Sequence, residues 1–461
     1  MNVKIRMNDE QYNQLKSHLL NPDGKEAVAI ALCGRRTGEN ISCLSIREVF
    51  LIPYDDCTVR SSERLSWKTT LLKNLLPRAM QNGMGIVKIH SHPNGYAEFS
   101  VTDNDSDRDL FSSIYGWMND DYPHSSMVML PDGRMFGRCV DKNGNFHPLD
   151  LISVVGDNIC YWYSLPDRDL LPEFTIRNTQ AFGVGTTKLL NHLSVAVVGC
   201  SGTGSPVIEQ LTRLGVHKLV LVDPDRIEEK NLNRILNSRM SDVIEKKYKV
   251  DIAGQAIKNM GLGTLINTIP ENICTARAVR AVAECDIIFG CMDGNEGRHL
   301  LNRLAAFYQI PYFDVGVKLE ADGKGSISQI CGSVNYLQPG KSSLLSRNVI
   351  TIDGIEAEGM MRTDPVLYEK QCKEKYVKGI NVDSPAVISI NMHYASMAVN
   401  EFLARIHQFR DDDNDCFAQY GSSLTQSRFF YSPESEKCMA LSKHTGKGDR
   451  IPLLDMPTLS E

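Results

Sequence analysis

Apolar positions in the first 150 residues follow helical and strand spacing in mixed order. Tyr12, Leu15 and Leu19 recur at helical spacing, and Asn8 with Gln11 can form a capping box where this helix, residues 8–20, begins. Apolar runs and further periodic segments predict the other elements: strands 27–33, 46–52 and 86–92, strands near residues 127 and 135, and helices 67–82 and 101–118. This mixture predicts an α+β domain over residues 1–149.

The pattern changes after a connector at 150–173, which contains Pro166 and Pro172. Strands then alternate with helices: strand 195–198, helix 205–214, strand 218–222 and a later strand at 287–289. This alternation predicts a mostly parallel, Rossmann-like sheet over residues 174–410. Polar residues dominate 411–461, which predicts a partly ordered C-terminal tail.

Composition narrows the function by exclusion. The 461 residues carry a formal net charge of −6, which provides no basic surface for nucleic acid or an anionic membrane. The chain shows no signal peptide and no apolar run of membrane-spanning length, so a cytoplasmic protein is expected. None of the 13 cysteines belongs to a C-x-x-C pair, which disfavours a disulfide framework and a four-cysteine zinc site.

Two histidines and an aspartate are spaced to bind a metal ion. His90 and His92 lie two residues apart in a predicted strand, so their imidazoles point to one face. Asp103 lies in the first turn of the helix that Ser100 begins, from which its carboxylate can return to the end of that strand. Three ligands leave one position for water, as in a catalytic zinc site. The alternative is that Ser100 and Asp103 form only a capping box and that the histidines are exposed on an edge strand.

A metal-activated water needs a general base, and two glutamates are candidates. Glu26 precedes an apolar strand, where a lone carboxylate is unusual unless it faces a site. Glu48, in REVFLIP, is the competing candidate.

These residues together resemble the JAB/JAMM metalloprotease family. The resemblance covers about residues 1–145 and rests on a glutamate before an apolar strand that ends at Gly34, on HSHP, and on SVTD seven residues further on. It implies a JAB/MPN-like domain that cleaves isopeptide or peptide bonds after the C-terminal glycine of ubiquitin-like proteins. The roles that it implies are zinc ligands His90, His92 and Asp103, general base Glu26, and hydrogen-bond donor Ser100.

A glycine-rich turn joins a strand to a helix in VVGCSGTGSPV. Gly199, Gly202 and Gly204 allow a tight turn and a close approach to phosphates, although Ser201 replaces the second glycine of a G-x-G-x-x-G motif. Asp223 ends the next strand, where an acidic residue can bind ribose hydroxyls. On these residues alone, a dinucleotide dehydrogenase is the rival interpretation.

Charged residues further along favour adenylation over hydride transfer. Arg234 in NLNR, Lys249 in KYKVD and Asp293 in GCMDGNEGR supply two cations and a carboxylate. Attack of a carboxylate on an α-phosphate uses such cations for the developing charge and such a carboxylate for magnesium, whereas hydride transfer needs neither. For Lys249 the alternative is a solvated helix face in a basic run.

This order of motifs is similar to the ThiF/MoeB and ubiquitin-activating-enzyme superfamily over about residues 174–410. The resemblance implies ATP and magnesium as well as the following contacts: Gly199, Gly202 and Gly204 with the nucleotide, Asp223 with the ribose, Asn231, Arg234 and Lys249 with phosphates, and Asp293 with magnesium and the adenylate. Arg177 stands six residues before Gly183, like the family arginine that reaches into the partner subunit's ATP site. The resemblance therefore implies a homodimer.

Two departures limit what the resemblance implies. Relatives often carry zinc-binding cysteines after a Pro-Gly turn, but this chain has PGKSSLLSR, so a structural zinc is not expected. The segment before DSPAVIS, where a thioester cysteine often lies, offers Val382. Cys372 is the nearest candidate acceptor, because the lysines around it favour a thiolate; the alternative is an incidental surface cysteine.

Together the resemblances imply an α/β protein that fuses a JAB-type peptidase to an adenylation domain, as in bacterial operons with ubiquitin-like proteins and conjugating enzymes. The peptidase would trim a precursor or remove conjugates, and the second domain would activate the exposed C-terminus. One alternative is activation of a sulfur carrier for cofactor biosynthesis. Another is a non-catalytic scaffold for a ubiquitin-like protein, which zinc analysis and ATP–pyrophosphate exchange would distinguish from an enzyme.

Overall fold

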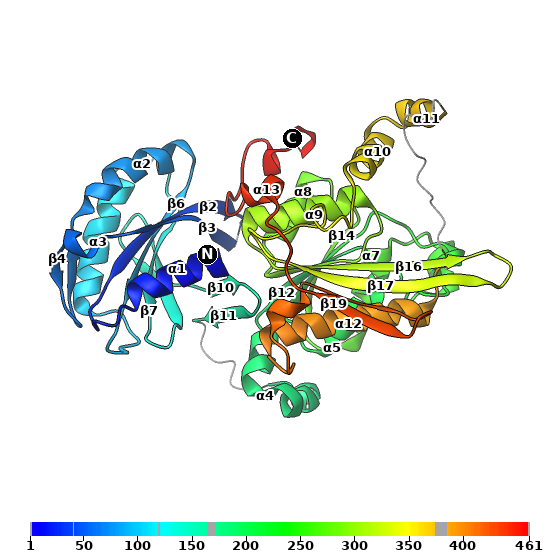
Figure 1. Ribbon diagram of the computed structural model, residues 1–461, viewed down its shortest axis with the longest axis horizontal. Helices are drawn as coiled ribbons and strands as arrows, with labels where there is room; N and C mark the ends of the chain where they lie inside the picture. The colour runs from blue at the N-terminus through cyan, green and yellow to red at the C-terminus, as the bar shows by residue number, and fades with distance from the viewer. Residues whose placement is uncertain (1, 40, 119, 165–170, 374–384, 460–461) are drawn as a thin grey trace. The chain divides into compact units, whose positions relative to one another are not determined.

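The structure is a computed structural model that describes residues 2–39, 41–118, 120–164, 171–373 and 385–459. The chain forms two compact units (Figure 1). The first unit contains residues 1–167, 307–309 and 444–455, and the second contains 168–306, 310–443 and 456–461. Among the described residues, no helix combines the length and apolarity needed to cross a bilayer.

A nine-stranded mixed sheet forms the first unit, in the order β11-β10-β1-β3-β2-β6-β7-β8-β9. Its strands are β1 (Asn2–Asn8), β2 (Val28–Thr37), β3 (Ile41–Leu51), β6 (Gly85–Ser91), β7 (His124–Met129), β8 (Met135–Val140), β9 (Phe146–Pro148), β10 (Leu151–Val155) and β11 (Ile159–Tyr163). A separate hairpin pairs β4 (Cys57–Arg60) with β5 (Leu65–Trp67).

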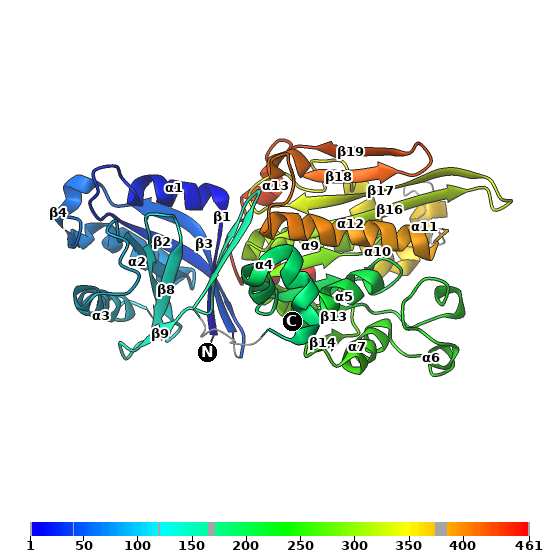
Figure 2. The ribbon, with the colours of Figure 1, turned by 90° about the horizontal axis from the view of Figure 1, so that it is seen from below.

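Helices cover both faces of this sheet (Figure 2). On one face, α1 (Asp9–Leu19) packs apolar side chains against β1, β2 and β3. On the other, α2 (Leu72–Gln81) and α3 (Val101–Tyr115) pack against β2 and β6. The predicted capping box is present, since the Asn8 side chain accepts from the Gln11 N–H and the Gln11 side chain accepts from the Asn8 N–H.

Three expectations for this region need correction. Residues 150–163 are not a linker, because β10 pairs with β1 and β11 pairs with β10; the prolines that suggested a boundary follow the sheet. Gly34 does not end its strand, because β2 continues to Thr37. The sequence interpretation also missed β1, a buried strand between β10 and β3.

The segment His444–Asp455, which we call the C-terminal strap, belongs to the first unit. The N–H of Gly34 donates to the carbonyl of Gly446 at 3.1 Å, and the N–H of Asp449 donates to a β2 carbonyl at 2.6 Å. A Cβ atom at Gly34 would lie 2.1 Å from the carbonyl carbon of Lys447. Only glycine therefore permits the strap to lie this close to β2.

Gly34→Ala is expected to lower the free energy of unfolding of the first unit by about 1–3 kcal/mol, because the added methyl group must displace strap backbone. Denaturant unfolding of the full chain measures this loss. Gly185→Ala is the matched control, because nothing lies within 4 Å of the site where its Cβ would be. Equal stability of the two variants would contradict the packing argument.

An eight-stranded sheet forms the second unit, in the order β14-β13-β12-β15-β16-β17-β18-β19. Its strands are β12 (Ser194–Val198), β13 (Lys218–Val222), β14 (Leu265–Ile269), β15 (Ile287–Gly290), β16 (Tyr312–Ala321), β17 (Ile327–Leu337), β18 (Gln419–Ser423) and β19 (Arg428–Ser432). Pairing is parallel from β14 to β16 and antiparallel from β16 to β19. The first five strands follow the 3-2-1-4-5 order of a doubly wound fold, as the alternating pattern predicts.

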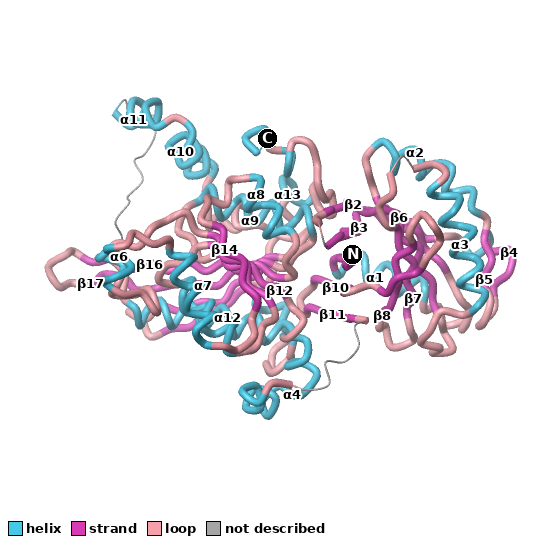
Figure 3. The backbone as a smooth tube through the Cα atoms, turned by 180° about the vertical axis from the view of Figure 1, so that it is seen from behind, coloured by secondary structure: helices cyan, strands magenta, loops and turns pink. Residues whose placement is uncertain are grey.

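The helices of the second unit are α4 (Ile176–Leu190), α5 (Gly204–Arg213), α6 (Met240–Ile244), α7 (Lys249–Met260), α8 (Ala276–Ala283), α9 (Asn295–Tyr308, whose end belongs to the first unit), α10 (Ile352–Thr363), α11 (Pro365–Lys373), α12 (Ile388–Ile406) and α13 (Met439–Ser442). The strands lie between α8 with α9 on one face and α5 with α12 on the other (Figure 1), and Figure 3 shows α8, α9 and α12 from behind. The partly ordered tail predicted for residues 411–461 is, over the described residues 411–459, part of the fold, because β18 and β19 extend this sheet and the strap joins the first unit.

Candidate metal site and nucleotide cavity

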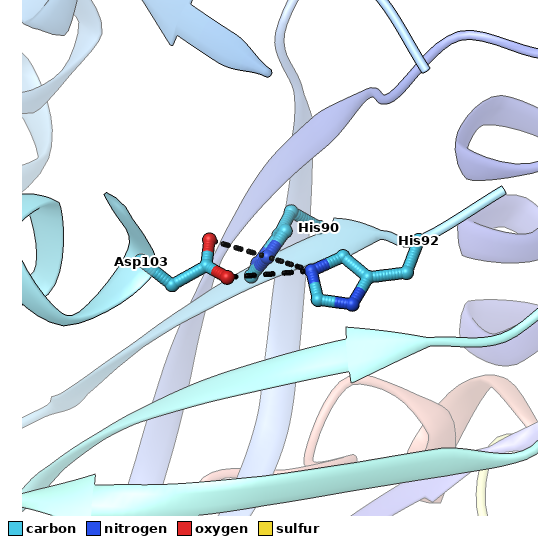
Figure 4. Close-up of side chains that lie close together, drawn as sticks. All are labelled: His90, His92 and Asp103. Atoms are coloured by element: carbon cyan, nitrogen blue, oxygen red, sulfur yellow. Dashed lines mark hydrogen bonds and ion pairs between the residues drawn. The ribbon is translucent and has the colours of Figure 1, made fainter. Parts of the chain in front are cut away.

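The first unit brings His90, His92 and Asp103 together at the end of β6 (Figure 4). The Nε2 atoms of the two histidines lie 3.1 Å apart. Asp103 Oδ1 lies 3.1 Å from His90 Nε2, and Asp103 Oδ2 lies 3.4 Å from His92 Nε2. Both histidines are buried, and β6 lies between β2 and β7, so the alternative of exposed histidines on an edge strand is wrong.

This donor set fits a zinc ion. A tetrahedral zinc with ligands at 2.0–2.1 Å separates the ligand atoms by about 3.3 Å, close to the three separations in the cluster. His92 Nδ1 lies 2.7 Å from the Tyr96 carbonyl oxygen. A proton on Nδ1 would satisfy that carbonyl and leave the Nε2 lone pair for the metal.

The capping box at α3 is present, and it orients the third ligand. Ser100 Oγ donates to Asp103 Oδ2 at 2.7 Å and accepts from the Asp103 N–H at 3.1 Å. Burial would raise the pKa of Asp103, but the hydrogen bonds with His90 and His92 outweigh it, so the pKa is lowered and the carboxylate stays ionised. Capping and metal binding are therefore compatible roles for Asp103.

Glu26 lies shortly before β2, the neighbour of β6, and lines the same small cavity as His90, Ser100 and Asp103. Val28 pairs with His90 in the antiparallel ladder, which brings the residues before β2 toward His92. Burial raises the pKa of Glu26 to about 7, a suitable value for a general base. Glu48 does not line this cavity; it pairs with Leu32 in the ladder and forms an ion pair with Arg78 at 2.5 Å.

The second unit has a cavity of about 440 Å³ at the carboxyl ends of its parallel strands. Its walls come from the segments that follow β12, β13, β14 and β15. The strand order reverses between β12 and β15, the position where doubly wound folds bind nucleotides.

Two predicted carboxylates line this cavity. Both oxygens of Asp223 accept backbone hydrogen bonds, from Cys200 at 2.7 Å and from Asp225 at 2.9 Å, which fixes the carboxylate after β13. Asp293 follows β15 and is open to the cavity. Desolvation raises the pKa of Asp293, although the positive charges of Arg298 and Arg234 act to lower it.

The glycines of the turn after β12 have different roles. Gly199 lines the cavity with a φ of 89°, and a Cβ there would lie 2.5 Å from the Cys291 carbonyl oxygen. Gly202 and Gly204 do not line it: a Cβ at Gly204 would lie 1.8 Å from the Gly199 carbonyl oxygen, and one at Gly202 would contact Arg234. The packing of the turn therefore requires glycine at position 204, where a side chain would strike backbone.

The predicted phosphate-binding residues lie beside the cavity rather than on its walls. Lys249 is buried at the start of α7, and its Nζ donates to Asp225 Oδ2 at 2.7 Å, so the alternative of a solvated lysine is wrong. Arg234 donates to the Lys230 carbonyl at 2.9 Å. Asn231 is buried, and its side chain accepts from the N–H of Glu228 at 3.0 Å.

The remaining two predicted residues are apart from the cavity walls. Arg177 is exposed on α4 and donates to Gln180 Oε1 at 3.0 Å. Cys372 is half-buried on α11. Val382 lies outside the described residues.

The sequence interpretation missed the α10 side of the cavity. Glu358 lines it and accepts at 2.8 Å from the N–H groups of Asn295 and Glu296, which begin α9. Arg362 also lines it and donates to both carboxylate oxygens of Glu296. No motif of the sequence analysis marked Glu358 or Arg362, whose partners lie more than 60 residues earlier in the chain.

Comparison with known proteins matches the second unit. The model of the ThiF family matches residues 175–439. Ubiquitin-like modifier-activating enzyme 5 of Bombyx mori is 27% identical over 171 residues, which cover 35% of this chain and 41% of that protein. Adenylyltransferase and sulfurtransferase MOCS3 of Caenorhabditis briggsae is 30% identical over 146 residues, 32% of this chain and 36% of that protein. The chain thus spans about two-fifths of the length of the curated relatives it matches.

One solved structure, E. coli MccB with MccA-N7isoASN, aligns with a TM-score of 0.47 and 15% identity, and covers 59% of this chain and 75% of that one.

Proposed function

Because the chain belongs to the ThiF family, we propose that its second unit adenylates the C-terminal carboxylate of a ubiquitin-like or sulfur-carrier protein. The observation that carries this proposal is the cavity at the reversal of strand order, with Asp223 and Asp293 on its walls. The curated relatives are a ubiquitin-like modifier-activating enzyme and an adenylyltransferase and sulfurtransferase, so both carrier classes remain candidates.

In the proposed step, a carboxylate oxygen of the carrier attacks the α-phosphorus of ATP, and pyrophosphate leaves as its bond to that phosphorus breaks. Asp223 would accept hydrogen bonds from the ribose hydroxyls, for which its backbone bonds orient it. Arg234 and Lys249 would contact the phosphates once ATP occupies the cavity, and Asn231 would support them. Asp293 would hold magnesium, which, when bound, neutralises phosphate charge.

We propose, second, that the first unit is a JAB/JAMM-type zinc isopeptidase. The juxtaposition of a zinc-compatible cluster and a glutamate with a raised pKa supports this function. His90, His92 and Asp103 would hold the ion, which, when bound, increases the acidity of a water molecule. Glu26 would take the proton from that water and deliver it to the leaving amine, and Ser100 would donate a hydrogen bond to the developing oxyanion.

The two proposed activities can act on one carrier. Cleavage after a C-terminal glycine would expose the carboxylate that adenylation requires. A conjugating enzyme would then receive the activated carrier, directly or through Cys372; mass spectrometry of carrier adducts would identify the acceptor. If the activated carrier reacts with a sulfur donor instead of a conjugating enzyme, the sulfur-carrier alternative is supported. If no carrier supports ATP–pyrophosphate exchange, a non-catalytic scaffold is favoured.

A mixing experiment tests the proposed homodimer. Arg177→Ala and Asp293→Ala chains are each expected to be inactive, and their mixture should recover up to about a quarter of the wild-type pyrophosphate exchange. In a hybrid dimer, Arg177 from one chain and Asp293 from the other would complete one site. No recovery in demonstrated hybrid dimers would disprove action across subunits, and exchange by a proven monomer would remove the need for a dimer.

A further inference from the structure

Three buried charged side chains lie beside the proposed metal site, and the proposed chemistry does not use them. Lys88, Asp107 and Arg138 are 4%, 0% and 6% exposed. Lys88 Nζ lies 2.7 Å from Asp107 Oδ1, and the Arg138 guanidinium donates to Asp107 Oδ2 from Nε at 3.2 Å and from an Nη atom at 2.6 Å. Burial would raise the pKa of Asp107, but Lys88 and Arg138 lower it, so the Asp107 carboxylate stays ionised.

The cluster joins the elements that carry the metal ligands. Asp107 follows Asp103 by one turn of α3. Lys88 precedes His90 by two residues in β6, so the side chains of Lys88 and His90 point to the same face of the sheet, toward α3. Arg138 reaches α3 from β8, where it also donates to the Asn104 side chain. The three charges thus connect α3 to β6 and β8 at the level of the ligands.

Aromatic side chains fix the direction of the arginine. The guanidinium carbon of Arg138 lies 3.7 Å from the ring centroids of both Phe99 and Phe146. Phe99 lies directly before Ser100 and 6.4 Å, between ring centroids, from His90. Arg138 is therefore held between two rings while it bonds α3.

Stability alone does not account for such a cluster. Apolar residues of similar volume often replace a buried ion pair without loss of stability, because desolvation offsets the attraction between the charges. Apolar contacts, however, permit a helix to slide or rotate, whereas three directional hydrogen bonds to one carboxylate do not. A site whose third ligand lies on that helix benefits from this restriction.

We propose that Asp107 is a positioning residue for the metal site, and that its bonds to Lys88 and Arg138 hold α3 where Asp103 meets the two histidines. This inference rests on the proposed zinc site of the first unit. Loss of the cluster should weaken zinc binding even where the fold is stable.

The test compares zinc affinity, by chelator competition on the full chain, between wild type and two variants. Asp107→Asn removes the charge at constant volume, and the triple variant Lys88→Met, Asp107→Leu, Arg138→Met removes all three charges while burial is kept. Zinc affinity should fall 10–100-fold in both, as is usual when support of a metal ligand is lost, while the melting temperature of the triple variant stays near wild type. For the carrier fusion, kcat should fall more than KM rises.

Asp23→Asn is the matched control, since it removes the Arg60 ion pair of the same unit outside the cavity and should leave zinc affinity unchanged. Wild-type affinity in a folded triple variant would overturn the positioning role and leave the proposed peptidase intact. Absence of zinc binding by the wild type itself would overturn both. If Asp107→Asn does not fold, the triple variant decides the question.

Discussion

Asp293→Ala should reduce carrier-dependent ATP–pyrophosphate exchange by about two to three orders of magnitude, the usual loss when a group that stabilises transition-state charge is removed. Asp293 is open to the cavity after β15, whereas the carboxylates of Asp223 and Glu358, which also line the cavity, accept backbone hydrogen bonds. The measurement is incorporation of labelled pyrophosphate into ATP with saturating carrier.

Glu320→Ala is the matched control. Glu320 is exposed on the β16–β17 hairpin, and among the described residues its carboxylate forms an ion pair with Lys318 alone. It should retain wild-type exchange. Exchange by Asp293→Ala within a factor of a few of wild type would contradict the proposed role, since magnesium and the adenylate would then be held elsewhere.

Glu26→Gln should abolish cleavage of a ubiquitin-like fusion, a loss of about 10²–10⁴-fold, while zinc remains bound. The change removes the base and leaves all three ligands of the cluster in place. Cleavage is measured by release of the fusion partner, and zinc by metal analysis of the same sample. The Glu48→Gln variant should cleave the fusion at the wild-type rate. If Glu48→Gln abolishes cleavage and Glu26→Gln does not, Glu48 is the general base.

A pH measurement on the metal-free protein checks the environment of Glu26. Burial raises its pKa from 4.5 to about 7, so the folded state binds this proton more tightly than the unfolded state. Glu26 therefore lowers the stability of the fold progressively as pH rises from about 4.5 to 7. The Gln variant lacks this penalty and should be the more stable protein at pH 7, but not at pH 4.

Local signals predicted the elements whose structure is decided by neighbouring residues. The capping box of Asn8 and Gln11, the strand of the histidines and the βαβ unit after residue 194 all depend on short spacings, of which the longest is Ser194 with Lys218 in the βαβ unit. β1, β10 and β18 depend on partners far along the chain: β1 pairs with β10 some 147 residues later, as in Lys4 with Leu151, and β18 pairs with β17, as in Ser423 with Cys331. The residues of a short strand carry no sequence pattern that identifies a pairing strand so far along the chain.

The same distinction applies to the sites. The motif that contains His90, His92 and Asp103 identified a cluster, because its three members come from one strand, one turn and one helix. The motif could not indicate that Asp107 joins Lys88 and Arg138, since that depends on how α3 lies on the sheet. It likewise could not place Glu358 at the first turn of α9, 63 residues away.

The C-terminal strap imposes an order on synthesis. Gly34 meets its partner Gly446 only after some 410 further residues have been added, which at 5–20 residues per second takes roughly 20–80 s. Until then the part of β2 that the strap covers must remain without its cover, while residues 168–306 and 310–443 of the second unit have already been synthesised. A ribosome that stops before residue 444 would thus release a chain whose proposed peptidase lacks part of its own fold, so completion of the first unit requires that synthesis has passed the strap.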